Sequence, residues 1–296
     1  MKHTLILLLL FKISFGAFAQ TDSASTQVMS SSETRSTNES PYTTRFAVDG
    51  PIIGAGLGLT FLGFKGIQNK DPLTDPELEA LNAPGAKDKI NGFDRFSAGW
   101  YSPAADDASY IPFYASFVYP VIGLLNKNTR GKAGQVGVLY LETMATTGAL
   151  FTLAAGYIVR HRPLVYDTRS EAEGGASDAK SKSKNSQRAF FAGHTAATAA
   201  ASFFAAKVFA DFNPDSKLKP YVWGAAALTS ASVGYLRLKA GQHFLSDNII
   251  GFGVGMAAGI LVPHFHKTKN KVDGLSFQPT MLPNGGGGMA MTYRLN

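Results

Sequence analysis

The chain contains no cysteine, so its 296 residues cannot form a disulfide framework or a thiolate metal site. Charged residues are also scarce, at 17% of the sequence, whereas 45% of the residues are hydrophobic. The net charge of +7 is spread through loops rather than along a basic stripe with interleaved aromatic residues, which argues against a nucleic-acid partner.

The N-terminal residues are typical of an exported protein. Residues 1–19 begin with Lys2, continue as an apolar run and end in the small-residue pattern A-F-A, as in a secretory signal peptide. Residues 20–44 are rich in Ser, Thr, Glu and Asn, and predict a disordered linker. We therefore expect the folded domain to begin at residue 45.

The rest of the chain predicts an all-α fold, a helical bundle of about six core helices in one domain spanning 45–270. The expected helices are 47–65, 110–126, 134–160, 190–210, 219–238 and 244–265. The hydrophilic connection 164–189 is a candidate flexible lid. The tail 271–296 contains the run P-N-G-G-G-G between two apolar stretches and predicts a small β-hairpin.

The apolar segments are borderline in length for membrane spans, which need about 20 residues. Gly251, Gly255 and Gly259 form two overlapping G-x-x-x-G units, a pattern that permits close helix packing in lipid. Segment 47–65 has only about fourteen continuous apolar residues, so we expect five spans without it.

With residue 20 exported, five spans put the basic loop 127–132 in the cytoplasm and the candidate site in the periplasm. Six spans would put the site in the cytoplasm. We therefore expect a bacterial inner-membrane protein whose active site faces the periplasm. A soluble periplasmic bundle is the alternative.

Residues 236–247 read L-R-L-K-A-G-Q-H-F-L-S-D and carry the most informative pattern. His243 and Asp247 are four apart, so on a helix they share one face and the carboxylate can orient the imidazole. With Arg237 they supply a nucleophile, an orienting group and an oxyanion-binding guanidinium, the parts of a phosphoryl-transfer site. The alternative interpretation is a solvated helix face.

Two further segments fit the same chemistry. Arg162, in R-H-R-P at the end of an apolar helix, suits bidentate phosphate contacts, although a basic helix end also complements the macrodipole. Gly193 and His194 precede a run of small apolar residues. A glycine at a helix start lets backbone N–H groups approach an oxyanion, and the histidine can protonate a leaving oxygen. A histidine near a helix N-terminus is the less specific alternative.

In this order the three segments resemble the type 2 phosphatidic acid phosphatase and haloperoxidase superfamily, over roughly residues 110–265. Its signature is K-x6-R-P, then P-S-G-H, then S-R-x5-H-x3-D. The resemblance implies a phosphatase that hydrolyses a phosphomonoester or pyrophosphate, on a phosphorylated lipid head group, without a cofactor. It also implies that His243 is the nucleophile, that Asp247 orients it and that His194 is the general acid. The implied phosphate ligands are Arg162, Arg237 and Gly193.

The chain departs from this signature at four positions. Ala155 stands in place of the lysine and Ala192 in place of the serine of the second motif, so two phosphate contacts are missing. Phe191 replaces the proline and Leu236 the first serine of the third motif. Arg160 is a candidate for restoring the lost positive charge.

These departures keep other functions open. One alternative is a catalytically silent family member that binds an anionic lipid or acts as a scaffold. Vanadate-dependent halide oxidation fits less well, because vanadate would lose the same two contacts. No metal site is expected, since His161, His264 and His266 lack carboxylate or thiol partners at ligand spacing along the chain.

Overall fold

The computed structural model describes residues 40–268, 275–281 and 287–293. The predicted signal segment 1–19 and residues 20–39 of the predicted linker lie outside these residues. The described α-helices are α1 (Phe46–Gln68), α2 (Asp75–Asn82), α3 (Pro103–Gly123), α4 (Lys127–Arg130), α5 (Ala133–Tyr157), α6 (Asp178–Lys182), α7 (Gly193–Phe212), α8 (Lys219–Lys239) and α9 (Leu245–Phe265). Short 3₁₀ turns occupy Ala86–Lys89, Arg95–Ser97, Pro163–Tyr166, Glu171–Glu173 and Lys184–Gln187.

The six long helices are those expected from the sequence, which confirms the all-α bundle. The largest boundary difference is at α3, which begins at Pro103 rather than at residue 110. Ser102 caps this helix by accepting a hydrogen bond from the Ala105 N–H at 3.2 Å, and a proline is favoured at the first helical position. The local cap therefore extends the helix beyond its apolar stretch.

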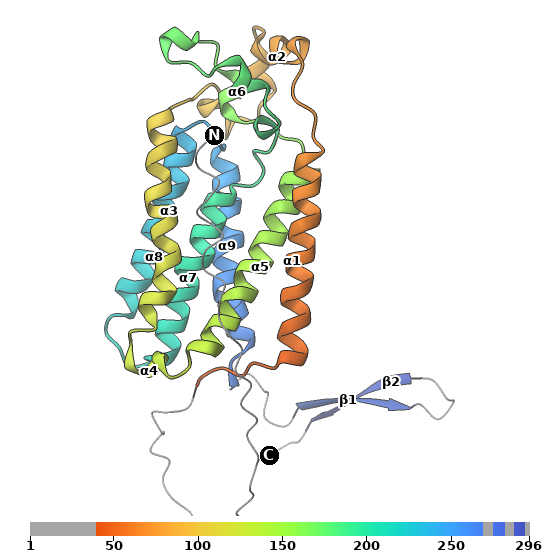
Figure 1. Ribbon diagram of the computed structural model, residues 1–296, viewed down its shortest axis with the longest axis vertical. Helices are drawn as coiled ribbons and strands as arrows, with labels where there is room; N and C mark the ends of the chain where they lie inside the picture. Colours follow the sequence, from red (N-terminus) through yellow and green to blue (C-terminus); the bar gives the residue numbers. More distant parts are fainter. Residues whose placement is uncertain (1–39, 269–274, 282–286, 294–296) are drawn as a thin grey trace, which may run out of the picture. The chain divides into compact units, whose positions relative to one another are not determined.

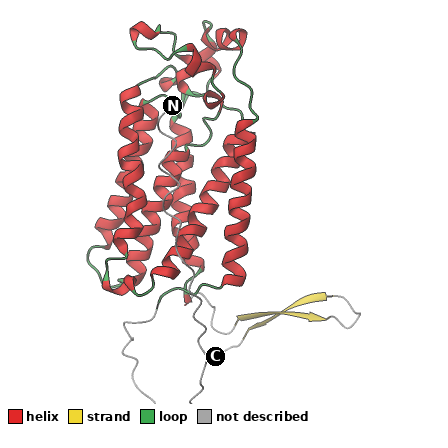
Figure 2. Ribbon diagram, in the orientation of Figure 1, coloured by secondary structure: helices red, strands yellow, loops and turns green. Residues whose placement is uncertain are grey.

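The strands β1 (Leu275–Met281) and β2 (Gly287–Tyr293) form an antiparallel hairpin in which Leu275 pairs with Tyr293. The hairpin agrees with the expectation from the glycine-rich tail. Within the bundle the connections gather at two ends (Figure 2). The loop-rich end holds residues 69–102, 158–192 and 240–244. The far end holds residues 40–45, 124–132, 213–218 and 266–268.

Helix α7 is the centre of the bundle, with α3, α5, α8 and α9 packed on it, while α1 packs on α5 (Figure 1). Small residues make these approaches close. A Cβ atom at Gly255 would lie 2.0 Å from the carbonyl oxygen of Ala196 on α7, and one at Gly63 of α1 would lie 2.4 Å from Thr152 of α5. Only glycine fits at such positions, which explains the G-x-x-x-G pattern of α9.

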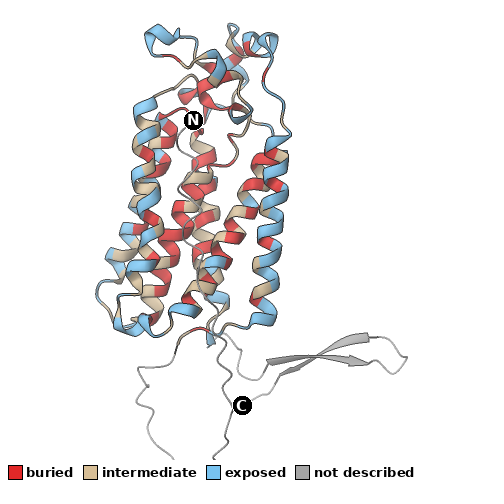
Figure 3. Ribbon diagram, in the orientation of Figure 1, coloured by how far each residue is buried: buried red, intermediate tan, exposed pale blue. Residues whose placement is uncertain are grey.

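Many residues on the outer faces of the helices are exposed (Figure 3), and large apolar residues are numerous among the exposed ones. On α1, for example, Leu57 and Phe61 are 59% and 60% exposed. Such a surface is unfavourable in water and is normal in lipid. Three of the described helices, α1, α5 and α9, are long and apolar enough to cross a membrane. The fold is that of a membrane-embedded helical bundle.

The expectation that segment 47–65 is too short to span is corrected by α1. The helix has 23 residues because it continues on both sides of the apolar run, from Phe46 to Gln68. Its start is fixed by the preceding residues, which the composition assigned to a disordered linker. Tyr42 is buried at the far end, where its hydroxyl donates to Asp211 at 2.8 Å, and the Thr43 N–H donates to the His266 carbonyl at 2.8 Å.

Candidate active site

Most of the predicted site residues converge at the loop-rich end of the bundle. Arg162 follows α5, His194 is the second residue of α7, Arg237 lies in the last turn of α8, and His243 lies in the turn before α9. One cavity of about 240 Å³ is lined by Arg162, Gly193, His194, Arg237 and His243, together with residues of α3 and of the 164–189 connection. Asp247 does not line this cavity.

The imidazole ring of His243 is fixed by a hydrogen bond from one of its nitrogens to the backbone. Its Nδ1 lies 2.6 Å from the carbonyl oxygen of Ala189, which can only accept, so Nδ1 carries the proton. Burial, and then the charges of Arg162 and Arg237, lower the pKa of His243 well below 6.5. The imidazole is therefore neutral at pH 7, and Nε2 keeps a lone pair for nucleophilic attack.

Asp247 was expected to contact His243, but in the structure it contacts other groups. The helix α9 begins at Leu245, so His243 lies before it and the i, i+4 geometry does not apply. Asp247 instead accepts the N–H of Phe244 at 2.9 Å and closes the first turn of α9. Its other oxygen lies 3.0 Å from Arg160 Nη1. Asp247 thus fixes the backbone beside His243, while Ala189 fixes the ring.

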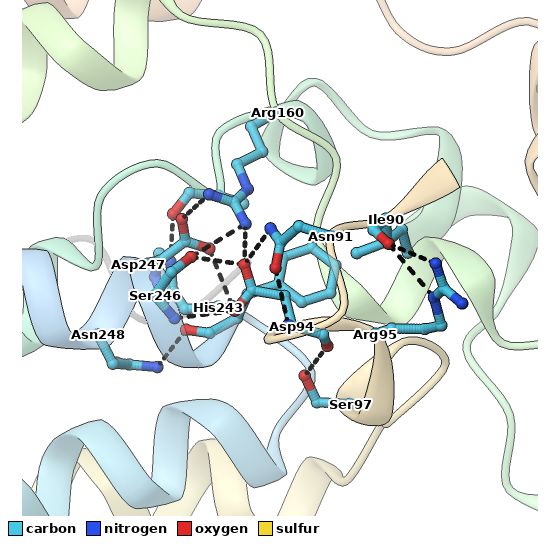
Figure 4. A network of polar contacts seen from close by, with 12 residues as sticks. Ile90, Asn91, Asp94, Arg95, Ser97, Arg160, His243, Ser246, Asp247 and Asn248 are labelled. Atoms are coloured by element: carbon cyan, nitrogen blue, oxygen red, sulfur yellow. Dashed lines mark hydrogen bonds and ion pairs between the residues drawn. The ribbon is translucent and has the colours of Figure 1, made fainter. Parts of the chain in front are cut away.

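Arg160, the candidate for the missing positive charge, belongs to this supporting network rather than to the cavity (Figure 4). It bridges Asp247 and Asp94, with a distance of 2.6 Å to the latter. Asp94 also accepts the Ser246 N–H at 2.9 Å and its hydroxyl at 2.6 Å. Burial raises the pKa of Asp94, but the hydrogen bonds from Ser246, Asn91 and Arg160 outweigh burial and hold the pKa below its ordinary value.

Three guanidinium groups converge on the cavity, from Arg162, Arg188 and Arg237. The Nε atom of each is buried and has no hydrogen-bond partner among the described residues. Burial, and then the charges of Arg188 and Arg237, lower the pKa of Arg162 to about 9. Three like charges that converge with buried, unpaired Nε donors are unfavourable alone and are stabilised by an anion, so the cavity suits a multiply charged oxyanion.

Arg188 was missed in the sequence, although it opens the stretch R-A-F-F-A-G-H that contains the second motif. Arg188 brings a third cation to the cavity, whereas the family signature has a lysine at the position of Ala155. Ala155 itself is fully buried in α5 and does not line the cavity. The structure thus brings a third cation to the cavity from a different segment, which no spacing rule within the motif predicts.

Two polar side chains hold the arginines in place. The carboxylate of Asp106, in the first turn of α3, accepts a hydrogen bond from Arg237, and the amide of Gln242 donates to the same carboxylate at 2.9 Å. The Gln242 carbonyl accepts from Arg162. Since these contacts use the terminal nitrogens, the Nε groups stay available to a ligand.

His194 is placed between aromatic rings at the start of α7. The ring of Phe113 lies 4.5 Å away and that of Tyr110 lies 5.3 Å away, centroid to centroid. Burial, and then Arg237, Arg162 and Arg188, lower the pKa of His194 well below 6.5. An anion bound among the arginines would offset their charges and raise this pKa, so that proton uptake is coupled to ligand binding.

Gly193, the residue before His194, is required for close packing over the cavity. A Cβ atom there would lie 2.4 Å from the ring of Phe151. The preceding Ala192 is the N-cap of α7 and makes no side-chain cap hydrogen bond. The 164–189 connection, expected to be a flexible lid, forms short helical turns and contributes Lys180 and Ser183 to the cavity wall.

The described residues thus form a helical bundle in which His194, His243 and three arginines line one cavity at the loop-rich end. Residues 136–271 match the sequence model of the PAP2 superfamily. The resemblance read from the motifs is thereby confirmed over this segment.

Among solved structures the chain is similar to a transmembrane PAP2-type phosphatidylglycerolphosphate phosphatase from Bacillus subtilis. The identity is 18% and the TM-score 0.45, over 73% of this chain and 98% of that chain. Among curated proteins there is no significant match.

Proposed function

We propose that this protein hydrolyses a phosphomonoester or pyrophosphate on a lipid head group, through a phosphohistidine intermediate. The observation that carries the proposal is the pairing of a neutral, backbone-bound His243 with three arginines whose Nε donors have no partner among the described residues. A nucleophile and an oxyanion cradle in one buried cavity are what phosphoryl transfer requires.

In the first step His243 Nε2 attacks phosphorus and the bond from phosphorus to the leaving oxygen breaks. Arg162, Arg188 and Arg237 hold the non-bridging oxygens, whose charge they balance. His194 gives its proton to the departing oxygen, having gained that proton when the substrate anion entered. In the second step a water molecule attacks the phosphorylated His243, the N–P bond breaks and inorganic phosphate is released.

The lipid part of the proposal rests on the position of the cavity. It lies at the end of helices whose outer faces are apolar, and its volume of about 240 Å³ suits a phosphate group rather than acyl chains. A substrate anchored in the bilayer would present its head group at this level while its chains remain in lipid.

The proposal also puts the cavity on the periplasmic side of a bacterial inner membrane. If the six long helices all cross, both termini of the bundle lie on one side and the cavity on the other. The far-end connection 124–132 is short and carries Lys127, Arg130 and Lys132, which favours the cytoplasm. In this arrangement residue 45 lies in the cytoplasm. It therefore differs from the arrangement with an exported N-terminus that residues 1–19 predict.

The function is tested by phosphate release from a panel of substrates by the purified protein in detergent. The panel contains lipid A phosphate, undecaprenyl pyrophosphate, phosphatidylglycerol phosphate and a soluble phosphoester. We expect release from at least one lipid, inhibition by vanadate, and no release by His243→Ala. Rapid quenching should trap an acid-labile phosphoprotein in the wild type only. Equal release by wild type and His243→Ala would instead favour the silent, anionic-lipid-binding alternative, and halide oxidation with vanadate would favour a haloperoxidase.

A further inference from the structure

A second cluster of buried ionisable groups lies at the far end of the bundle, away from the arginine cavity. It contains Asp49 of the first turn of α1, Glu142 of α5 and His266, the residue that follows α9. One oxygen of each carboxylate and the Nε2 of the imidazole all lie within 4.8 Å of one another. The three residues come from the three helices that are apolar enough to cross a membrane.

The orientation of the imidazole makes this cluster unusual. His266 Nδ1 lies 2.7 Å from the carbonyl oxygen of Val262, so the Nδ1 proton is donated there. Nε2 then faces Asp49 Oδ1 at 3.2 Å, within hydrogen-bonding distance, and Glu142 Oε2 at 3.5 Å. A positive charge at this point, either a proton on Nε2 or a bound cation, is needed to offset the repulsion between the two carboxylates.

The neighbouring lysines that the structure describes at this end do not supply that charge. Among the described residues at this end, Lys207 and Lys267 both pair with Asp211, which also accepts the hydroxyl of Tyr42. Glu142 is only 5% exposed, and its Oε2 has no hydrogen-bond partner. A buried carboxylate oxygen aimed at a histidine nitrogen without a hydrogen bond is costly unless it binds a cation.

The distances from His266 Nε2 to the two carboxylate oxygens suit a metal ion. Ligand atoms bound at about 2.0–2.1 Å in a tetrahedral zinc site lie about 3.3–3.4 Å apart, close to the two distances of 3.2 and 3.5 Å. The surrounding contacts also fit. A zinc-bound histidine commonly donates its other ring N–H to a backbone carbonyl, as His266 does, and the second oxygen of Asp49 is held by the Arg45 N–H at 2.7 Å.

We propose that Asp49, Glu142 and His266 bind one divalent transition-metal ion, of the zinc type, that joins α1 to α5 and α9. One imidazole nitrogen and two carboxylate oxygens are a common ligand set for this class of ion. The site is structural, because it lies at the opposite end of the bundle from the cavity. The expectation that His266 lacks carboxylate partners is thereby corrected: its partners are far away in the sequence and only folding brings them together.

The test uses the full chain, purified in detergent with an affinity tag free of histidine and stripped of metal with EDTA. Zinc is then titrated by calorimetry, and bound metal is counted by mass spectrometry. We expect one zinc per chain and a higher melting temperature with zinc. Glu142→Gln and His266→Gln should each weaken binding by at least roughly tenfold. His264→Gln, at the same end, and His243→Ala, in the cavity, should bind like the wild type.

Substitution with cobalt gives a measurement that does not depend on variants that fold. Cobalt bound to the wild type should show visible absorption bands of low-coordinate nitrogen and oxygen ligands, which zinc then displaces. If the wild type binds neither zinc nor cobalt, the cluster is a protonated imidazole between two carboxylates and the proposal is overturned. It is equally overturned if Glu142→Gln and His266→Gln bind zinc as the wild type does. Neither result depends on phosphatase activity.

Discussion

Arg160 Nη1 lies 3.0 Å from Asp247 Oδ1, and this ion pair ties the segment after α5 to the first turn of α9. Both Asp247 and Asp94, the second partner of Arg160, have fully buried side chains. The guanidinium of Arg160 therefore stabilises two buried carboxylates close to His243.

Replacing Arg160 by Gln should strongly destabilise the fold. The two carboxylates lose their partner, and breaking a buried pair costs about 3–5 kcal/mol. Unfolding by denaturant in detergent micelles measures the change. The matched control is Arg95→Gln, whose ion pair with Asp88 is exposed and should contribute about 0–1 kcal/mol. Equal stability of the two variants would contradict the supporting role of Arg160.

Removing Arg188 should lower turnover without unfolding the protein. Loss of one donor to a developing oxyanion typically costs about 10²–10³ in rate, and Arg188 is assigned that task in place of the missing lysine. Steady-state phosphate release by Arg188→Ala measures the effect. Lys89→Ala removes an exposed positive charge at the same end and should leave the rate unchanged. If both variants lose rate, the cause is the overall positive charge at this end and not a specific contact of Arg188 with the substrate.

Restoring the two signature residues should have opposite effects. Ala192 is an N-cap without a side-chain hydrogen bond, so Ala192→Ser adds a cap of about 0.5–2 kcal/mol and a hydroxyl beside the cavity. Ala155 is fully buried within α5, so Ala155→Lys buries an unpaired ammonium and should destabilise the protein. Melting temperatures and phosphate release of both variants check this. Higher activity of Ala155→Lys would mean that α5 turns this position toward the cavity.

Acid should weaken the fold through His243. Its folded-state pKa lies well below 6.5, because of burial and then Arg162 and Arg237, whereas in the unfolded chain the imidazole takes up a proton near pH 6.5. Below that pH the unfolded state binds more protons, so the free energy of unfolding falls as the pH decreases. Between pH 7.5 and 5 the wild type should lose more stability than His243→Gln. Parallel curves would show that His243 titrates normally.

Membrane orientation is open to a direct test, because the chain has no cysteine of its own. Ala172, in the 164–189 connection, and Lys127, at the far end, are both exposed and suit substitution by Cys. In intact spheroplasts an impermeant thiol reagent should label Ala172→Cys only, while lysed cells should show labelling of both. Labelling of Lys127→Cys alone in intact spheroplasts would reverse the proposed orientation.

The helices and the centre of the site could be predicted from sequence because each depends on local information. Apolar stretches long enough to form buried or lipid-facing helices located all six long helices, and motif spacing located His194, His243 and the two motif arginines. The partner of His243 could not be predicted this way. It depends on where α9 begins, and the backbone of Ala189 reaches the ring only after α7 and α9 pack together.

The side chains that complete both clusters come from segments without a recognisable motif. Arg188 and Asp106 belong to connections or helix starts whose composition predicts ordinary solvent-facing polar residues. Glu142 is a single carboxylate within the apolar helix α5. Their roles depend on contacts between elements distant in sequence, and a single chain carries no local signal for such contacts.

The glycine contacts between α1 and α5 set the order in which the chain can be assembled. Helix α1 is synthesised first, but its partner α5 emerges only after α2, α3 and α4, and α3 itself packs on the still later α7 and α8. During translation both early helices must wait in the bilayer, or beside an insertion factor, with their packing faces open. Because Gly63 and Gly156 approach so closely, α1 can dock on α5 in one register only, and this docking follows the synthesis of α2, α3 and α4.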